Sequence, residues 1–430
     1  MKKKIKWLSL LCLSPVFFGC VEEFEPENIT EVLEGALVVD ARISDQNMQH
    51  TIFLTRTFPF EAAMPIQESG AQVNILDDLG NSINFSETAP GTYNTSSAIT
   101  LQHNRAYTLE ITTVDGVRYS SNAEAMPSRV EVAEVHAERR VNSSETEGIA
   151  ILVDNQDNAS QPNYFRYEYD ETYKVVAPDF NPFTWDVIDY DFFCEDDDGW
   201  EVTVAPRGED ANICFANEKS NDIILATTAN LTSNNLDDYE VRFLGTDNYA
   251  ISHRYSILVK QYHHDINAAS FFNSLNDFSS SESIFSNVQT GQLEGNINVE
   301  NSDVAIVFGY FELSSYSEKR LFFNYEDFFP NEPLPPYIIN CDFTSGPELY
   351  PEGFHATVID GKVVIDGTSN SPLIDGILAG LLGYVGDNEN YLEVDEAGEA
   401  DGSPFLTKAL GCVDCRVYGN NTPPDFWIEE

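Results

Sequence analysis

The run His263-His264-Asp265 groups three side chains of kinds that bind transition metals. It ends an apolar stretch that begins near Tyr255, and this pattern favours a strand. Because adjacent residues of a strand point to opposite faces, the two imidazoles do not converge on one ion. The surrounding sequence indicates no third ligand, so we predict that this run holds no metal.

A separate acidic stretch, Glu195–Gly199, contains carboxylates that suit calcium. In an EF-hand loop the first and last ligand positions carry carboxylates, and a glycine lies between them. With Gly199 at the glycine position, those two places are occupied by Cys194 and Ala205. The EF-hand interpretation therefore fails, and irregular calcium binding or a solvated surface loop are the alternatives that remain.

Cys412 and Cys415 are separated by two residues, a spacing shared by redox sites, zinc sites and disulfides. A thioredoxin-like pair begins a helix that follows a strand. Here the pair lies near the carboxyl end, shortly before Pro423 and Pro424, and Cys341 is the only other cysteine in this half of the chain. We predict a structural disulfide, with zinc binding and redox chemistry as alternatives.

Nucleophilic catalysis leaves no recognisable pattern in this chain. The G-x-S-x-G elbow that presents a serine nucleophile is absent. Seven histidines and many carboxylates are present, but their spacing matches no acid–base constellation. We predict no catalytic residues, no bound cofactor and no enzymatic activity.

The elements that would position these residues follow a basic amino terminus. Lysine occupies four of the first six positions, and Trp7 to Phe18 carry no charge. This core is too short to span a bilayer, which takes about 20 apolar residues, and it matches a secretory signal. The run Phe17-Phe18-Gly19-Cys20 then has the form of a lipobox, with phenylalanine where leucine is commonest. We expect residues 1–19 to be removed and Cys20 to carry covalent lipid; an ordinary cysteine behind a conventional signal peptide is the alternative.

An exported chain folds in an oxidising compartment, so disulfides are the default state of the cysteines behind Cys20. Two disulfides among five cysteines allow 15 arrangements and leave one thiol free or paired elsewhere. We consider two pairings: Cys194 with Cys214 would close a short acidic hairpin, and Cys341 with Cys412 or Cys415 would tie back the carboxyl end. The five candidates are Cys194, Cys214, Cys341, Cys412 and Cys415.

The composition is that of a folded and strongly acidic chain. Hydrophobic residues make up 42% and aromatic residues 12%, with 28 Phe and 20 Tyr, which excludes a disordered acidic tail. The formal net charge is −48, from 71 acidic and 23 basic residues. Phosphate binding requires clustered Lys and Arg, so we predict no nucleic-acid partner. A surface of this charge repels anions.

Short strands separated by turns characterise residues 34–127, behind an acidic tether at 20–33. Gly35–Ile43 is strand-like, and Ala71–Ile75 alternates with the period of two expected of a half-buried strand. The dipeptide Asp115-Gly116 supplies the positive φ of a tight hairpin turn. About seven such strands predict a β-sandwich of immunoglobulin or transthyretin type.

A larger β-rich domain with long insertions is predicted for residues 128–430. Its strands include Tyr164–Tyr169, in which aromatic and charged residues alternate, and a strand pair formed by Val304–Leu313 and Arg320–Asn324. The predicted fold class is therefore mainly β, with a few short helices.

One short helix is predicted directly after the His-His-Asp run. Asp265 is placed to cap its amino terminus. The apolar residues behind it recur with helical spacing and share one face. They are Ala268, Phe271, Phe272 and Leu275.

Taken as an ordered set, motifs along the chain resemble a family of Bacteroidota lipoproteins catalogued as domain of unknown function 4249. The resemblance spans nearly the whole chain behind Cys20. Its pieces are Glu34–Ile43, Thr51–Phe58, Gly70–Val73, Gly91–Tyr93, Asp115–Tyr119, Arg254–Tyr262, Ser283–Phe285, Gly295–Ile297, Phe308–Phe311, Lys319–Arg320, Cys412–Arg416 and Pro424–Trp427.

This resemblance implies an outer-membrane lipoprotein without known catalytic residues. Genes of the family often lie beside TonB-dependent outer-membrane transporters, which implies an accessory subunit or a lid over a β-barrel. The acidic run Val21–Glu25 resembles the signal that sends Bacteroidota lipoproteins to the outer face of the outer membrane. Cys194 does not fit the family pattern. The cysteines that fit it are Cys214, Cys341, Cys412 and Cys415.

We therefore expect a non-enzymatic outer-membrane lipoprotein, facing the cell exterior, that docks on a TonB-dependent or other β-barrel complex. A free-standing glycan- or peptide-binding lipoprotein is the alternative, and a hydrolase that uses an acidic pair is a third hypothesis. Aromatic residues in the insertions are candidate contact residues, since aromatics are enriched in interface cores; packing beneath a loop is their other possible role. They are Phe180, Phe183, Trp185 and Trp200.

Overall fold

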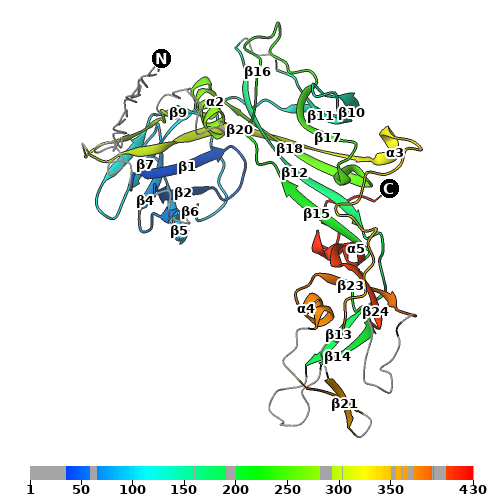
Figure 1. Ribbon diagram of the computed structural model, residues 1–430. Coiled ribbons are helices and arrows are strands. Elements are labelled where there is room, and N and C mark those ends of the chain that lie inside the picture. The colour runs from blue at the N-terminus through cyan, green and yellow to red at the C-terminus, as the bar shows by residue number, and fades with distance from the viewer. Residues whose placement is uncertain are drawn as a thin grey trace, which may run out of the picture.

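A computed structural model of the chain describes residues 35–58, 65–157, 161–189, 200–280, 293–302, 304–349, 355–359, 362–366, 371–389, 391 and 403–429. Within these ranges the chain is mainly β with a few helices, which confirms the predicted fold class. Three units follow one another in space: an amino-terminal sandwich, a second unit built on long strands, and a distal unit (Figure 1).

The amino-terminal sandwich is a single curved sheet wrapped around its own core. Its strands are β1 (Leu37–Ser44), β2 (Thr51–Arg56), β3 (Ile66–Gln67), β4 (Gln72–Asp77), β5 (Ser82–Ala89), β6 (Thr92–Thr95), β7 (Ala106–Thr112), β8 (Arg118–Ser121), β9 (Glu124–Ala125), β19 (Ile297–Val299) and the first half of β20 (Val307–Asn324). Neighbours follow the order β20-β1-β2-β6-β5-β4-β7-β8-β19. The predicted hairpin at Asp115-Gly116 is confirmed, because β7 and β8 pair on either side of it and Gly116 has a φ of 83°.

Residues from late in the chain complete this sandwich. β19 pairs with β8, and β20 runs parallel to β1. Asn296 joins these two ends, since its side chain accepts a hydrogen bond from Phe311 N (2.8 Å) and donates one to Phe311 O (2.9 Å). The core accordingly includes Ile297, Phe311 and Leu313. The sandwich therefore extends beyond the predicted range 34–127, which omits the strands that close it.

The motif Phe308-Gly309-Tyr310-Phe311 serves two faces of β20. Phe311 is fully buried in the sandwich core, while Tyr310 packs on the other face in a separate apolar cluster. Gly309 has a φ of 117°, and a Cβ there would lie 1.9 Å from the carbonyl oxygen of Val39. Glycine is therefore required where β20 lies against β1.

β20 is one continuous strand of 18 residues and not the predicted pair Val304–Leu313 and Arg320–Asn324. Its first half pairs with β1 and its second half with the second unit, so one strand joins the two. The serine-rich stretch in its middle continues the strand because buried hydroxyls bond to neighbouring backbone; Ser315 Oγ donates to Ser128 O at 3.0 Å. Polar side chains here do not mark a turn.

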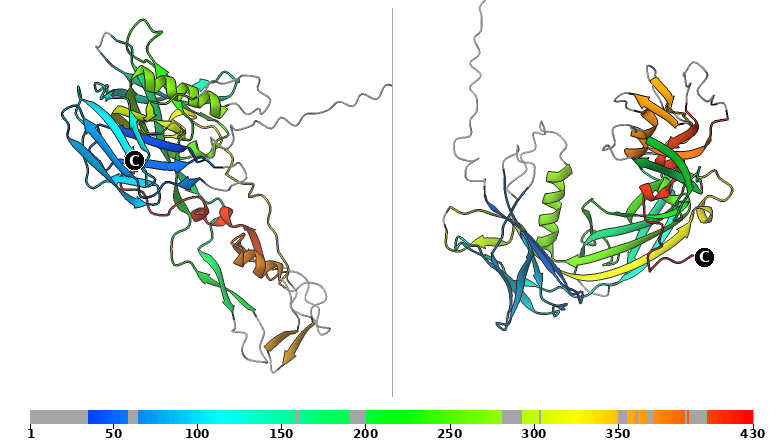
Figure 2. Two further views of the ribbon diagram at one scale, coloured as in Figure 1. Left: turned by 90° about the vertical axis from the view of Figure 1, so that its left-hand side faces the viewer. Right: turned by 90° about the horizontal axis from the view of Figure 1, so that it is seen from below.

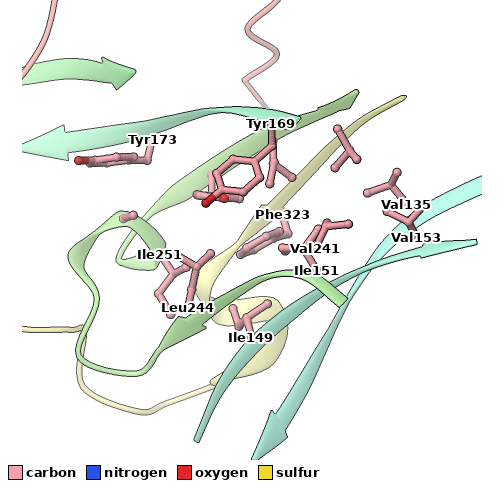
Figure 3. Close-up of a cluster of buried hydrophobic side chains, with 14 of the residues drawn as sticks. Val135, Ile149, Ile151, Val153, Tyr169, Tyr173, Val241, Leu244, Ile251 and Phe323 are labelled. Carbon is pink, nitrogen blue, oxygen red and sulfur yellow. The ribbon is translucent and has the colours of Figure 1, made fainter. Parts of the chain in front are cut away.

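The second unit packs a three-stranded sheet against the long strands. Its elements are β10 (Val132–Val141), β11 (Glu147–Asn155), β12 (Tyr164–Val176), β15 (Ile213–Lys219), β16 (Ile224–Thr227), β17 (Tyr239–Gly245), η1 (Tyr249–Ile251), β18 (Arg254–His264), the second half of β20, and α3 (Tyr325–Phe328). β12 and β18 pair with each other, and β18 pairs with β20. Figure 3 shows the core between the sheets, where Ile149, Ile151 and Val153 of β11 lie on one side and Tyr169 and Phe323 on the other.

The distal unit lies at the opposite end of the long strands from the sandwich (Figure 2). Its elements are β13 (Phe183–Asp189), β14 (Trp200–Pro206), β21 (His355–Ile359), β22 (Lys362–Asp366), α4 (Pro372–Leu378), β23 (Leu382–Asp387), β24 (Phe405–Ala409), α5 (Leu410–Val413) and η2 (Cys415–Val417). β13 pairs with β14, β21 with β22, and β23 with β24.

Two disulfides tie the carboxyl-terminal segment to the rest of the chain. One joins Cys214 of β15 to Cys415, and the other joins Cys341 to Cys412. The second is one of the pairings that we considered. The pairing of Cys194 with Cys214 is wrong, because Cys214 bonds to a cysteine 201 residues away. Cys194 itself lies outside the described residues, as do Cys20, the tether and the acidic loop Glu195–Gly199.

The predicted helix after the His-His-Asp run is α2 (Ile266–Ser280). Asp265 caps it as expected, since its Oδ1 accepts a hydrogen bond from Ala268 N at 2.8 Å. Ala268, Phe271 and Phe272 are buried on one face, with Leu275 packed beside them, so the predicted apolar face is also confirmed. Among the helices within the described ranges, none has the length and apolarity needed to cross a membrane.

Candidate functional site

Two hollows lie side by side where the amino-terminal sandwich meets the second unit. Asp40 and Arg42 of β1 and Arg166 and Glu168 of β12 line both of them. The larger hollow, which we call the junction pocket, has a volume of about 420 Å³. Small-molecule sites commonly measure about 300–1,000 Å³. The other residues that line the junction pocket are Val38, Val39, Tyr167, Ser220, Asn221, Asp222, Ile223, Phe271, Phe272, Leu275, Leu293, Phe308, Gly309 and Tyr310.

The smaller hollow has a volume of about 230 Å³ and lies on the other side of the four shared residues. Its wall includes Met48 and Phe53, whose exposed fractions are 44% and 45%. Polar residues from β1 and the following loop make up much of the remainder. The four shared charged residues thus separate the smaller hollow, whose lining is both polar and apolar, from the more apolar junction pocket.

Helix α2 supplies the apolar wall of the junction pocket. Its buried face presents Phe271, Phe272 and Leu275, and the ring of Phe271 lies 5.0 Å from the ring of Tyr310 on β20. The periodicity that buries this face was visible in the sequence, but the partner strand was not. Phe271 packs on the rings of both Phe272 and Tyr310.

Arg166 forms the charged floor of the pocket. Its side chain is only 5% exposed, and its Nη2 donates to Glu312 Oε2 at 3.1 Å. Its Nη1 donates to Glu168 Oε1. The guanidinium also lies over two rings, 4.3 Å from the centroid of Tyr262 and 5.1 Å from that of Phe272. Burial lowers the pKa of Arg166, but the two carboxylates outweigh burial, so the group stays charged.

Glu312 lies beneath Arg166 with a side chain that is 0% exposed. His264 Nδ1 donates to its Oε1 at 3.0 Å, and the imidazole stacks on the ring of Phe272. Burial alone would raise the pKa of Glu312, but Arg166 and His264 more than offset it and lower the pKa to about 2. The buried carboxyl group is therefore ionised at neutral pH.

Arg42 carries the ionic chain from the floor to the rim. It binds Asp40 with two hydrogen bonds of 2.8 and 2.9 Å, and its Nη1 lies 3.5 Å from Glu168 Oε1. The side chains of Arg42, Asp40 and Glu168 are 45%, 44% and 33% exposed, in contrast to the floor. We call the continuous set the junction network; it consists of Asp40, Arg42, Arg166, Glu168, His264 and Glu312.

The junction network is arranged for binding more than for proton transfer. Both arginines are matched to carboxylates, and the pKa of Glu312 lies far from neutrality. Within the network and the lining of the junction pocket, three buried side-chain polar atoms nevertheless have no hydrogen-bond partner among the described residues. They are Arg166 Nε, His264 Nε2 and Tyr310 Oη.

His263 and His264 do not converge, in line with the strand geometry expected of them. His263 Nδ1 donates to Ser128 O at 2.8 Å, whereas His264 bonds to Glu312. Their different partners lie in the linker before β10 and in β20. The pair therefore fixes two parts of the fold to β18.

A second ionic group, which we call the edge cluster, lies on the three-stranded sheet of the second unit. It consists of His136, Arg140, Asp154 and Asp238. Ligand atoms of its histidine and two aspartates lie within 4.8 Å of one another, so these three residues could hold a metal ion. However, His136 Nε2 faces Asp238 (3.2 Å) while its Nδ1 faces Asp154 (3.7 Å), and Arg140 lies 3.3 Å from Asp238. The guanidinium group of Arg140 thus already neutralises Asp238, one of the three candidate ligands.

The four aromatic residues that we predicted as contact residues lie in different environments. Trp185 packs edge-on against Tyr384 and Phe405 at 5.3 Å, and its indole N–H donates to Leu382 O. Phe180 packs on the core of the second unit, and Phe183 is 43% exposed. The side chain of Trp200 lies outside the described residues. Trp185 and Phe180 therefore have packing roles, and contact by Phe183 stays a prediction.

Sequence reasoning did not identify Arg166 and Glu312 as site residues. Both were visible as charged residues inside strands that are otherwise aromatic or apolar. A charge in such a strand indicates either an exposed position or a buried ion pair. Their pairing was not visible, because 146 residues separate them.

Comparison with known protein families gives a match over most of the chain. The model of the family described as a domain of unknown function (DUF4249) matches residues 21–320. No curated protein matches the chain. The match ends inside β20, so the resemblance drawn from Cys412–Arg416 and Pro424–Trp427 stays a prediction.

Proposed function

This chain belongs to the DUF4249 family, and from that premise we propose that it is a non-enzymatic, lipid-anchored outer-membrane protein. In this proposal it docks on a TonB-dependent or other β-barrel complex as an accessory subunit. It captures a ligand in the junction pocket and thereby assists uptake or stabilises the assembly. Cys20 carries the lipid, and the acidic residues behind it lead the chain to the cell exterior.

The observation that carries the proposal is the composition of the junction pocket. It has the volume of a ligand site, and residues of both the sandwich and the second unit line it. Four of its five charged side chains, those of Asp40, Arg42, Arg166 and Glu168, are held in ion pairs with one another or with Glu312. Such a site suits recognition, in which an apolar wall provides affinity and a few polar groups fix orientation.

Two further features support an exported docking subunit. The disulfides Cys214–Cys415 and Cys341–Cys412 are typical of proteins that fold in an oxidising compartment. The elongated arrangement places the sandwich and the distal unit at opposite ends of the long strands, so each end offers a separate surface to a partner (Figure 2).

The proposal is tested by purifying the tagged full chain from outer membranes in mild detergent and identifying its partners by mass spectrometry. We expect a β-barrel in stoichiometric amount. A Cys20→Ala variant is the control for membrane attachment and should be lost from the membrane fraction. Recovery of the lipoprotein alone, at wild-type abundance, would overturn the docking role.

The apolar and aromatic wall of the pocket also favours the second candidate, a free-standing glycan- or peptide-binding lipoprotein. Phe271, Phe272 and Tyr310 offer ring surfaces of the kind that pack against a ligand. This candidate predicts no barrel in the purification and direct binding by the isolated chain. The docking candidate predicts the barrel whether or not the pocket is filled.

A further inference from the structure

We infer that the junction pocket selects ligands that combine an apolar body with a positively charged head, and that it discriminates against anionic ligands of the same shape. This inference rests on the proposed use of the pocket for ligand capture. It specifies the ligand chemistry, which the docking role leaves open.

The apolar body is indicated by the inner part of the pocket. Phe271, Phe272 and Leu275 of α2 line it together with Tyr310 and Phe308 of β20, and the rings of Phe271 and Tyr310 are in contact. Apolar surface removed from water contributes roughly 25 cal/mol per Å². A ligand without an apolar body would leave this wall in contact with water and gain little from it.

The positive head is indicated by the balance of charges around the pocket. Three acidic residues line it, Asp40, Glu168 and Asp222, against two basic residues, Arg42 and Arg166. Both arginines are already matched, because Arg42 binds Asp40 and Arg166 binds Glu168 and Glu312. An anionic ligand would have to compete with these carboxylates for the guanidinium groups.

Asp222 is the acidic group best placed to receive a cation. It lies on the rim in the loop between β15 and β16, and it is exposed. Within the described residues it has no ion-pair partner, in contrast to Asp40 and Glu168. A cation at the rim would supply that partner, and the chain's large net negative charge would favour its approach.

The buried floor supports a site built for recognition. Tyr310 lines the pocket and is more than nine-tenths buried, and its Oη has no hydrogen-bond partner in the described residues. Buried polar groups are normally satisfied, so groups left without a protein partner mark places where a ligand or water bonds. Tyr310 Oη can accept from an ammonium as well as donate.

The test uses three probes of one shape: phenylbutylamine, phenylbutanol and phenylbutyrate. The whole chain behind residue 20 is titrated with each at pH 7 and low salt, and binding is followed by NMR or calorimetry. We expect the amine to bind about fivefold more tightly than the alcohol, from one charge contact of about 1 kcal/mol at roughly 4 Å in water. The acid should bind more weakly than the alcohol, and added salt should narrow the differences.

Matched variants locate the effect. Asp222→Asn should remove the preference for the amine and leave affinity for the alcohol unchanged. Asp425→Asn removes another exposed carboxylate, one that does not line the pocket, and it should change nothing. Leu275→Ala should weaken all three probes by about fourfold, the effect of losing contact with about one methylene group.

Three results would overturn the inference: tighter binding of the acid than of the amine, equal effects of Asp222→Asn and Asp425→Asn, or no binding of any probe by a folded chain. None of these three results tests whether the chain docks on a β-barrel. If the purification recovers a β-barrel while the probes fail, the docking role stands and the ligand class is wrong. If the probes succeed without a barrel, the chain is a free-standing binder of this ligand class.

Discussion

The junction network and the edge cluster contain the same kinds of residue and differ mainly in burial. Each combines a histidine, at least one arginine and carboxylates in ion pairs. In the junction network the side chains of Arg166, His264 and Glu312 are at most 5% exposed. In the edge cluster those of His136 and Asp238 are 24% and 53% exposed. Residue types alone would therefore suggest equal importance, whereas the environment does not.

Burial changes what the two groups contribute. Exposed ion pairs are screened by solvent and salt and contribute about 0–1 kcal/mol. A buried pair gains little over an apolar pair of the same volume, but removing one partner leaves an uncompensated charge and costs several kcal/mol. The junction network is thus a feature that the fold tolerates only when it is complete.

The largest predicted effect is that of Glu312→Gln. The amide has one acceptor oxygen where the carboxylate has two, so either Arg166 or His264 loses its hydrogen bond, and the arginine loses its buried counter-charge. We expect the free energy of unfolding to fall by about 3–5 kcal/mol, measured by urea denaturation at pH 7.

The same variant has a pH signature. Because the pKa of Glu312 is lowered in the folded state, its stabilisation is complete above about pH 4.5 and is lost as the pH falls towards 2. Wild-type stability should fall over this window more steeply than that of Glu312→Gln. A double variant, Arg166→Met with Glu312→Leu, is the control and should recover part of the lost stability, since both charges are gone while His264 still lacks its acceptor. A loss below about 1 kcal/mol for Glu312→Gln would contradict the comparison.

Glu124 of β9 is a buried carboxyl group whose pKa is shifted in the opposite direction to that of Glu312, and we expect its substitution to have an effect of intermediate size. It is 8% exposed, accepts a hydrogen bond from Asn296 at 2.8 Å, and has Asp265 as an acidic neighbour. Burial, and to a lesser degree Asp265, raises its pKa to about 6. A raised pKa means that its contribution to stability is present below about pH 4.5 and is lost as the pH rises through 6.

We therefore expect Glu124→Gln to be more stable than the wild type at pH 7.5, by about 1–2 kcal/mol. The difference should disappear at pH 4, where the carboxyl group is protonated in both states. Thermal unfolding at the two pH values measures this. A variant that is destabilised at pH 7.5 would show that the carboxylate has a favourable partner at this position and would contradict the assigned sign.

Whether interacting residues lie close together or far apart in the sequence explains which features could be predicted from it. Local patterns were sufficient for the hairpin at Asp115-Gly116 and for the capped helix with its apolar face, because residues close in sequence determine both. β20 was divided in two because its serines are polar, and the backbone groups that satisfy them lie almost 190 residues away; the Ser315–Ser128 bond spans 187 residues. The closure of the sandwich by β19 and β20 was missed for the same reason, because their partner strands β8 and β1 lie far away in the sequence.

The site was harder to predict than the fold. Nothing near Arg166 in the sequence indicates that Glu312 will neutralise it, since the two strands meet only through β18. Likewise, the partner of Cys214 lies 201 residues away, and the nearer Cys194 was the wrong choice. Ion pairs and disulfides depend on which strands become neighbours, and periodicity carries no information about that.

The smallest predicted effect is that of Asp238→Asn in the edge cluster. Asp238 has a φ of 55°, a conformation that asparagine also adopts readily, so the backbone should not be strained. Its hydrogen bond to Asp154 uses the backbone N–H and survives the substitution. The side chain is exposed and its pairs with His136 and Arg140 are screened, so we expect the stability to change by no more than about 0.5 kcal/mol.

Thermal unfolding of the untagged protein with and without zinc completes the test of the edge cluster. We expect no zinc-dependent shift in the melting temperature, because Arg140 already neutralises Asp238. A zinc-dependent rise in the melting temperature of the wild type that is absent in Asp238→Asn would make the edge cluster a metal site and would break the comparison from its exposed side.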